Sequence, residues 1–381
     1  MDFELSEEQA MLRATVRDFA DKELAPVAAS LDRTAEYPAA EVKKMASLGL
    51  FGLTIPEKYG GSGKGLLDFC IVVEELACAS AALDNYLRVS LSLGIGPVVE
   101  YGTDAQKRKY LPPHASGEKL ACFALTEAGA GSDPSELSAT ATRCQGGYVI
   151  NGSKLFVSNG DRAGTVVVFA TVDKTLRHRG ITAFVLDRDT PGFSVGKHEE
   201  KMGLHGFTST ELVFEDCFVP EAARIGEEGQ GLKIALDVLD VSRVTVGAEA
   251  VGISRAACEA ALAYARERRQ FGQPISGFQA VQWLLADMAT QIDAARLLTF
   301  RAAFLHDRGR PFIKEAAMAK VFASEVSGFV TDKALQIHGG YGYTKDFPVE
   351  RYFRDARITQ IYEGTSEIMR MTIARSLLKE G

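Results

Sequence analysis

The sequence predicts a mostly helical protein with a β domain in the middle of the chain, an α+β fold. Apolar residues recur at helical spacing up to about residue 121, alternate at strand spacing over 122–230, and return to helical spacing over 231–381. A chain of 381 residues is also too long for one ordinary hydrophobic core. We therefore expect an N-terminal helical domain (1–121), a middle antiparallel β-barrel-like domain (122–230) and a C-terminal four-helix bundle (231–381).

Composition narrows the classes of function. A net charge of -7 and a pI near 5.6 argue against a general surface for nucleic acid or anionic membrane, while a local basic pocket for a phosphorylated ligand stays open. The acidic start, residues 1–4, lacks the features of an export signal, and no apolar run reaches membrane length, so we expect a cytoplasmic protein. The cysteines lack paired spacing, which predicts small buried hydrophobes in a reducing compartment and no metal site; they are Cys70, Cys78, Cys122, Cys144, Cys217 and Cys258.

Local signals predict helices in the first part of the chain. Residues 6–9 (SEEQ) form a capping box that begins a helix, and Pro26 ends or kinks it. Pro38 begins another helix and Gly49 ends it. The glycine-rich residues 59–63 lack the Gly-Lys-Ser/Thr of a phosphate loop and are interpreted as a connector.

Longer helical patterns follow. One covers 66–82 and continues with interruption to 99, and a shorter one covers 104–110 and ends at the two prolines 112 and 113.

The middle segment carries strand and turn signals. Residues 148–157 (YVINGSKLFV) predict a hairpin with Asn151-Gly152 at its turn. Further β-rich runs, separated by turn residues such as 189–192, are expected at 165–172, 181–186 and 211–214.

The C-terminal segment predicts long helices at 232–269, 279–306 and 311–337 and a short one at 349–356. Glu363 then lies on a short connector, because Thr365 is a good N-cap and Glu367 places negative charge in the first turn of a final helix. Gly364 lets a ligand approach the backbone beside this carboxylate, which is how a fixed base could be presented. The alternative is a solvated loop glutamate.

Four strings in order carry a family resemblance: LTEAGAGSD (125–133), RRQFG (268–272), QIHGG (336–340) and IYEGT (361–365). The chain resembles the acyl-CoA dehydrogenase family from end to end, and within it the short-chain (butyryl-CoA) branch. The resemblance implies FAD as cofactor, an acyl-CoA substrate, electron-transferring flavoprotein as acceptor, and a homotetramer in which two subunits contact each flavin.

The resemblance also assigns flavin-binding roles in the middle segment. Backbone amides near Gly131 approach the ligand, Ser132 lies at the flavin pyrophosphate and at CoA, and the residues along the flavin are Phe123, Leu125 and Thr126. Phe156 and Ser158 stand where the family usually has Trp and Thr, and keep the stacking aromatic and the hydroxyl for N5 in smaller form. Without the resemblance, we favour the interpretation of 125–133 as a turn that leads into the β domain.

A second set of residues is implied at the flavin of a neighbouring subunit. Arg268, Phe271 and Gln279 would reach this flavin, with Arg268 suited to its pyrophosphate, and Gln336, Gly339 and Gly340 would lie at its adenosine end. Thr365 and Glu367 would return near the pyrophosphate. The open alternatives are a surface salt bridge for Arg268 and an ordinary helix stop for the two glycines.

The implied reaction removes an α-proton and a β-hydride from the thioester. Glu363 is the implied base, its backbone amide and a flavin ribityl hydroxyl stabilise the enolate oxygen, and Gly364 leaves room for the thioester. Some branches place the base where this chain has Ser242, which cannot serve. Asp240 and Arg243 would lie on the substrate side of that helix, with Arg243 at CoA.

Arg88 is relevant to which acyl chain the substrate carries. It could meet an anionic acyl tail, but we favour the alternative that it points outward to solvent or to a neighbouring helix. Asp84, near the position of the arginine of glutaryl-CoA relatives, argues further against a glutaryl-type site. A straight, branched or cyclic short acyl chain remains open, as do a flavin oxidase or monooxygenase and a non-catalytic CoA-ester-binding relative.

Overall fold

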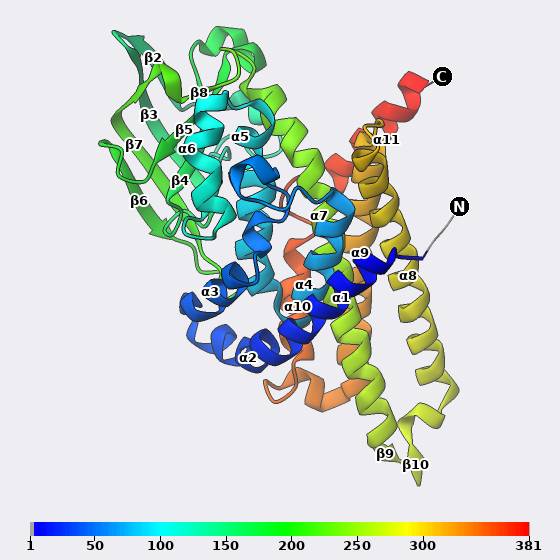
Figure 1. Cartoon of the computed structure of the whole chain (residues 1–381). Coiled ribbons are helices and arrows are strands. Elements are labelled where there is room, and N and C mark those ends of the chain that lie inside the picture. The colour runs from blue at the N-terminus through cyan, green and yellow to red at the C-terminus, as the bar shows by residue number, and fades with distance from the viewer. Residues whose placement is uncertain (1–3, 381) are drawn as a thin grey trace.

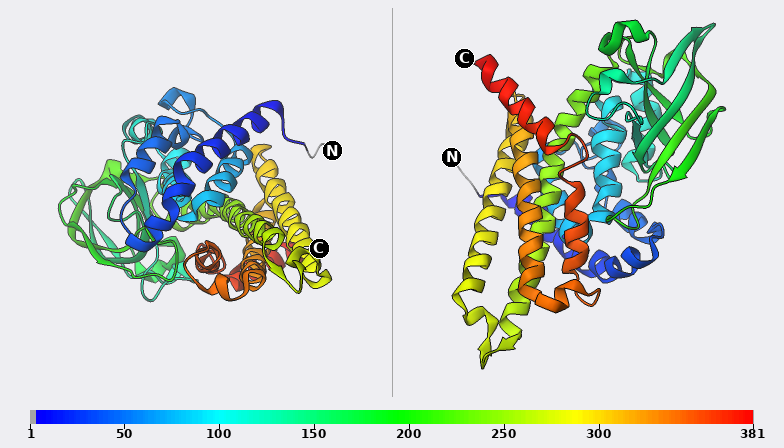
Figure 2. Two further views of the ribbon diagram at one scale, coloured as in Figure 1. Left: turned by 90° about the horizontal axis from the view of Figure 1, so that it is seen from below. Right: turned by 180° about the vertical axis from the view of Figure 1, so that it is seen from behind.

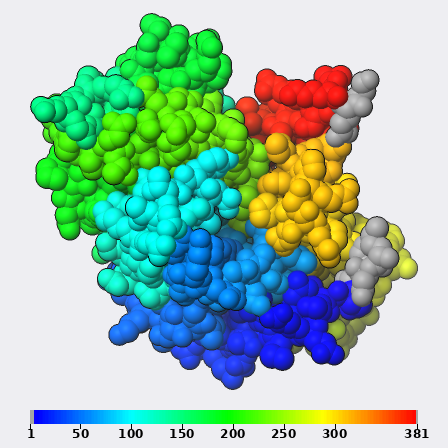
Figure 3. Space-filling model, turned by 45° about the horizontal axis from the view of Figure 1, so that its top comes forward, coloured from blue at the N-terminus to red at the C-terminus, as the bar shows by residue number. Residues whose placement is uncertain are grey.

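Three bodies of secondary structure make up the protein, in the order helices, sheet, helices (Figure 1). The structure, a computed structural model, describes residues 4–380, so most of the acidic start considered above lies outside the described residues. In the space-filling view the N-terminal helices (blue to cyan) fill the lower part, the β domain (green) lies at the upper left and the last helices (orange and red) lie at the upper right (Figure 3). The expected order of helical and β segments is confirmed.

The first helices follow the predicted signals. In α1 (Glu7–Phe19), Ser6 and Gln9 form both hydrogen bonds of the capping box. A π-helical turn then separates α1 from α2 (Ala25–Thr34), where Pro26 stands in the first turn. Pro38 caps α3 (Ala39–Ser47), and Gly49 follows it with a φ of 78°.

Helices α4 (Leu66–Val89) and α5 (Gly96–Tyr101) correspond to the helix predicted from residue 66 to 99 with an interruption, and a π-helical turn lies between them. The prediction for α6 (Asp104–Ala115) is wrong at its end, because the helix continues through Pro112 and Pro113. The two missing N–H groups would have paired with carbonyls four residues earlier, and those belong to exposed residues that water can serve.

The β domain is an open, mixed sheet, so the expected barrel-like closure and wholly antiparallel pairing are not found in residues 4–380. The path is β6-β7-β3-β2-β4-β5-β8; β1 pairs with β4 in parallel, and β2 meets β4 in parallel as well. The strands are β1 (Ala121–Ala124), β2 (Thr140–Cys144), β3 (Gly147–Ser158), β4 (Thr165–Thr171), β5 (Ile181–Asp187), β6 (Phe193–His198), β7 (Ser209–Pro220) and β8 (Arg224–Ile225).

The predicted turn at Asn151-Gly152 is wrong. Both residues lie inside β3, and the chain turns at Gln145-Gly146, between β2 and β3. Asn151 exchanges hydrogen bonds with Asp216 on β7, and a side chain at position 152 would meet Ala139 at 2.8 Å. Tertiary pairing with β7 therefore overrides the local Asn-Gly preference.

The C-terminal helices pack as a bundle seen most clearly from behind (Figure 2). Helix α7 packs on α4, α8 and α9, while α10 lies against α7 and α9 and α11 against α9. The elements are α7 (Gly231–Glu267), β9 (Arg269–Gln270), β10 (Gln273–Pro274), α8 (Gln279–Asp307), α9 (Ile313–His338), α10 (Val349–Ile358) and α11 (Ser366–Glu380).

No helix within residues 4–380 is both long enough and apolar enough to cross a bilayer. The same residues hold no group of three or more His, Cys, Asp or Glu suited to a metal ion. All six cysteines are free. The expectation that they are buried is confirmed for Cys70, Cys122 and Cys217, whereas Cys78 and Cys258 are half-buried and Cys144 is exposed because it ends β2 at the turn.

Candidate active site

Glu363 lies on the connector between α10 and α11 in a left-handed backbone conformation. Its φ is 55°, and that of Gly364 is 102°. A positive φ is uncommon outside glycine and costs free energy, so the surrounding contacts must hold it. Other side chains rarely adopt the φ of Gly364, which explains the glycine.

Two buried cations hold this turn by its carbonyl groups. Arg243 on α7 donates from Nε to the Glu363 carbonyl at 3.0 Å, and Lys320 on α9 donates from Nζ to the Gly364 carbonyl at 2.6 Å. Burial lowers the pKa of Lys320 to about 8. The strained turn is therefore held from two helices of the bundle.

The carboxylate of Glu363 meets Arg88. Arg88 donates from Nη1 to Oε1 at 2.8 Å, and the Glu363 side chain is only 6% exposed. The second oxygen, Oε2, is buried and has no hydrogen-bond partner within residues 4–380. The expectation that Arg88 points outward to solvent is wrong, because its side chain is fully buried against the candidate base.

Other buried groups hold the Arg88 guanidinium. Its Nη2 donates to Asn85 at 2.7 Å and to the Tyr362 hydroxyl at 3.0 Å. Its Nε lies 3.3 Å from the Glu249 carboxylate, which in turn pairs with the Tyr362 hydroxyl. Side chains from α4, from α7 and from the connector between α10 and α11 thus meet at the Arg88 guanidinium.

Acidic groups outnumber this cation. Glu249, Glu363 and Asp84 lie 3.3, 2.8 and 4.0 Å from the Arg88 guanidinium. Burial, and then repulsion from Glu249, raises the pKa of Asp84 well above its ordinary value, and burial raises that of Glu249. Both Asp84 oxygens lack hydrogen-bond partners in the described chain.

The remaining α7 residues lie beside this cluster. The Ser242 hydroxyl is 3.0 Å from that of Ser92 and 3.4 Å from Arg88 Nη1. Asp240 pairs with Arg243 at 2.5 Å, and burial raises its pKa. Arg243, expected at CoA, thus lies beneath the backbone of Glu363 with its charge paired to Asp240.

The loop after β1 is fixed by a buried ion pair. Lys154 Nζ lies 2.7 Å from Glu127 and donates to the Leu125 carbonyl at 3.1 Å. Burial lowers the pKa of Lys154 to about 8. A side chain at Gly129 or Gly131 would meet nothing within 4 Å, so the backbone there is open to a ligand.

The other predicted residues of this set have mixed exposure. Phe123 and Thr126 are half-buried, Leu125 is buried and Ser132 is exposed. Phe156 is 63% exposed with a φ of 55°, at a register shift between β3 and β7. A bulge re-aims a side chain, which presents this aromatic outward; Ser158 ends the same strand half-buried.

The second predicted set gathers at the far end of the bundle. Arg268, Gly339 and Gly340 line a cavity of about 520 Å³ with Tyr264 and His338. This end, with β9 and β10, lies away from the β domain in two views (Figures 1 and 2). Phe271, Gln279 and Gln336 are exposed there, whereas Thr365 and Glu367 begin α11 beside Glu363; Thr365 Oγ1 accepts from the Ile368 N–H at 3.4 Å.

Sequence reasoning missed four polar residues of the site: Glu249, Lys320, Tyr362 and Asn85. Glu249 and Lys320 interrupt otherwise apolar helical stretches, and a buried charge in such a stretch must be paired. That interruption is the signal that could have found them.

Three family models match the chain. They are "Acyl-CoA dehydrogenase, N-terminal domain" at residues 6–118, "Acyl-CoA dehydrogenase, middle domain" at 122–217 and "Acyl-CoA dehydrogenase, C-terminal domain" at 229–378.

Among relatives, the chain is 49% identical to an acryloyl-CoA reductase (NADH) of Anaerotignum propionicum, covering 100% of this chain and 96% of the relative. It is similar to the butyryl-CoA dehydrogenase of Megasphaera elsdenii, with a TM-score of 0.97, 45% identity and coverage of 99% and 100%. It is also similar to a chain solved in work on the electron transferring flavoprotein of Acidaminococcus fermentans and flavin-based electron bifurcation, with a TM-score of 0.98, 47% identity and 100% coverage of both chains.

Proposed function

This chain belongs to the acyl-CoA dehydrogenase family of FAD-dependent oxidoreductases, and we propose that it converts a short-chain acyl-CoA thioester to the 2-enoyl-CoA. The observation that carries the proposal is Glu363. Its carboxylate is almost fully enclosed, one oxygen is bound by Arg88, and the other is buried without a partner. A carboxylate held in this way is suited to take the α-proton of a thioester.

The first predicted set of cofactor residues fits FAD. Phe156 presents an exposed aromatic face, and the backbone at Gly129 and Gly131 is open to a ligand, as stacking and close approach of a flavin require. When bound, FAD accepts the hydride that leaves the β-carbon. We assign Phe123, Leu125, Thr126, Gly131, Ser132, Phe156 and Ser158 to the flavin of the same subunit.

The second cofactor set points to a homotetramer. Arg268 and the glycines at 339 and 340 line a cavity at the end of the bundle away from the β domain, so one chain does not bring both sets to one flavin. Phe271 and Trp283 are also exposed at this end, where a partner subunit would cover them. We propose that this end contacts the flavin of a neighbouring subunit.

The surroundings of Arg88 weigh against a dicarboxylic substrate. Its guanidinium already faces Glu363, Glu249 and Asp84. A further carboxylate would enter a region where acidic groups outnumber the cation, and repulsion would oppose it. We therefore propose an uncharged short acyl chain, straight, branched or cyclic, on a substrate whose CoA portion lies toward Arg243 and Ser132.

The test is a panel of CoA thioesters added anaerobically to the FAD-loaded protein. Propionyl-CoA, butyryl-CoA, isobutyryl-CoA, cyclohexanecarbonyl-CoA, glutaryl-CoA and octanoyl-CoA are scored by bleaching of the flavin absorbance. The proposal predicts rapid bleaching by a short uncharged member and weak bleaching by glutaryl-CoA and octanoyl-CoA. Absence of bleaching by every short member would contradict it.

Reoxidation separates the dehydrogenase from an oxidase on the same scaffold. We propose electron-transferring flavoprotein as the acceptor, so the bleached protein is expected to reoxidise quickly with it and slowly in air. Rapid peroxide production in air would identify an oxidase.

We further propose that segments 1–121, 122–230 and 231–381 act as domains and that the protein works in the cytoplasm.

A further inference from the structure

Arg88 is more than a counter-ion within the site, because its own position is fixed without Glu363. Asn85 and the Tyr362 hydroxyl accept from Nη2, and Glu249 faces Nε. The Asn85 amide also donates to Glu249, and Tyr362 pairs with the same carboxylate. Two hydrogen bonds at Nη2 and the ion pair of Nε with Glu249 leave this planar guanidinium little freedom to turn, although Nε itself has no hydrogen-bond partner among the described residues. The Nη1 edge therefore points in a defined direction.

The Nη1 edge meets the candidate base. Nη1 donates to Glu363 Oε1 at 2.8 Å, and Ser242 Oγ lies 3.4 Å from the same nitrogen. Oε1 is therefore occupied, while Oε2 is buried and unpartnered among the described residues. The two oxygens of the carboxylate thus have different surroundings.

The Glu363 backbone is held as firmly as its side chain. Arg243 and Lys320 hold the carbonyls of Glu363 and Gly364, and the φ of Glu363 is 55°. With the backbone fixed at one end and Oε1 at the other, the torsions between them are restrained. Precise placement of a catalytic group accounts for much of its effect on rate.

We propose that Arg88 is the positioning residue of the base: it holds Oε1 of Glu363 so that Oε2 receives the α-proton, and Asn85, Glu249 and Tyr362 hold Arg88. The inference rests on the proposed role of Glu363. Asp84 lies 4.0 Å from the Arg88 guanidinium, farther than Glu249 and Glu363, and makes no hydrogen bond to it, so these two carboxylates are the closer partners of the Arg88 charge.

The experiment follows α-proton transfer separately from hydride transfer. The FAD-loaded protein is mixed in D2O with an acyl-CoA analogue that has sulfur in place of the β-carbon, so that the α-proton exchanges but no hydride leaves. Mass spectrometry gives the exchange rate, and a titration gives the dissociation constant of the analogue. Flavin reduction by butyryl-CoA is measured in parallel.

Arg88→Met keeps the volume of the side chain and removes its charge. We expect exchange to slow by about 100-fold with a much smaller change in the dissociation constant. Arg88→Lys keeps the charge but loses the planar fork, and is expected to recover part of the rate. Exchange at the wild-type rate in either variant would overturn the inference.

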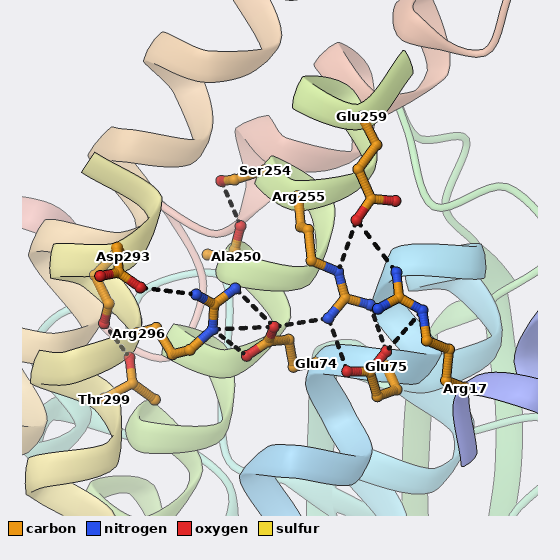
Figure 4. A network of polar contacts seen from close by, with 11 residues as sticks. Arg17, Glu74, Glu75, Ala250, Ser254, Arg255, Glu259, Asp293, Arg296 and Thr299 are labelled. Atoms are coloured by element: carbon orange, nitrogen blue, oxygen red, sulfur yellow. Dashed lines mark hydrogen bonds and ion pairs between the residues drawn. The ribbon is translucent and has the colours of Figure 1, made fainter. Parts of the chain in front are cut away.

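Arg255→Met is the matched control, because it removes a half-buried arginine of α7 that binds Glu74 and Glu75 on α4 and not Glu363 (Figure 4). It should lower stability and leave exchange by the folded, FAD-loaded protein unchanged. If Arg88→Met does not fold, Tyr362→Phe removes one anchor of Arg88 and is expected to slow exchange by about tenfold. An unchanged rate there would also overturn the inference.

The outcomes separate the two proposals. If Glu363→Gln exchanges at the wild-type rate, the base itself is misassigned and the proposed function fails. If Glu363→Gln loses exchange while Arg88→Met and Tyr362→Phe keep it, only the role of Arg88 is wrong.

Discussion

Two networks of arginines and buried carboxylates join α4 to α7, and they differ in how fully their groups are paired. Around Arg255, the carboxylates of Glu74 and Glu75 face guanidinium groups from more than one helix (Figure 4). Arg296 binds Glu74 at 2.9 Å, and Arg17 lies 3.9 Å from Glu75. This network links α1, α4, α7 and α8.

Around Arg88, acidic side chains outnumber the guanidinium groups that could pair with them. Three acidic side chains, Asp84, Glu249 and Glu363, share this one guanidinium, and three of their oxygens have no hydrogen-bond partner in the described residues. The adjoining backbone is also strained, with a φ of 55° at Glu363. Unpaired buried groups and strained backbone reduce stability, so their concentration at one site points to function. The Arg255 network, in which Arg255 Nε is the one buried side-chain atom without a hydrogen-bond partner among the described residues, serves the fold.

The largest expected loss of stability comes from breaking the paired network. In Arg255→Met, Glu75 stays buried and keeps a single ion pair, with the Arg17 guanidinium 3.9 Å away. Removing one partner of a buried ion pair costs about 3–5 kcal/mol, so the free energy of unfolding in urea should fall by that order. Arg255→Lys should cost less, and an unchanged unfolding midpoint in Arg255→Met would contradict the structural role.

Lys320 tests the strained turn at Glu363 and Gly364. Lys320→Met removes the donor to the Gly364 carbonyl and also removes a buried charge. We expect flavin reduction by butyryl-CoA to slow by about tenfold, with a smaller effect on stability because the two changes oppose each other. Lys333→Met on the same helix, whose lysine pairs with Asp332, is the control. Equal rates in both variants would show that the turn does not depend on Lys320.

The smallest expected effect concerns Asp84 and appears as a pH dependence. Its native pKa is raised above the ordinary value of 3.8, chiefly by burial and then by Glu249. Between the two values the native state keeps a proton that the unfolded chain has released, so the free energy of unfolding falls as pH rises. Asp84→Asn should remove this fall, so the free energy of unfolding of the variant relative to the wild type should be higher at pH 8 than at pH 4 in urea titrations.

Asp104 supplies a control of opposite sign. Hydrogen bonds from Tyr59 and Arg108 lower its pKa, so its contribution to stability is present above the ordinary pKa and lost as pH falls. Asp104→Asn should therefore weaken the protein only at the higher pH. The same slope for Asp84→Asn and Asp104→Asn would contradict the account of the Arg88 cluster.

Local signals in the sequence predicted much of the helical fold and little of the sheet. The capping box at Ser6 and the helix start at Pro38 depend on neighbouring residues, and both are confirmed. The turn expected at Asn151-Gly152 failed because pairing with Asp216, far along the chain, keeps the strand extended. Parallel pairing of β1 with β4 is likewise a long-range property that alternation of residues does not encode.

The site shows the same division. Glu363 could be proposed because its connector, glycine and following helix are adjacent in sequence. The inward direction of Arg88 could not, because it depends on Glu249 and Tyr362, which lie 161 and 274 positions away in the chain. A charged residue within an apolar helical stretch is a sign of such a partner, but it does not say which one.

The central claim is that Glu363 removes the α-proton. The most direct test is flavin reduction by butyryl-CoA in a stopped-flow experiment with Glu363→Gln, which keeps the shape of the side chain and loses its basicity. Loss of a positioned base predicts a rate lower by about 10²- to 10⁴-fold, with FAD and substrate still bound. Reduction at the wild-type rate would contradict the account.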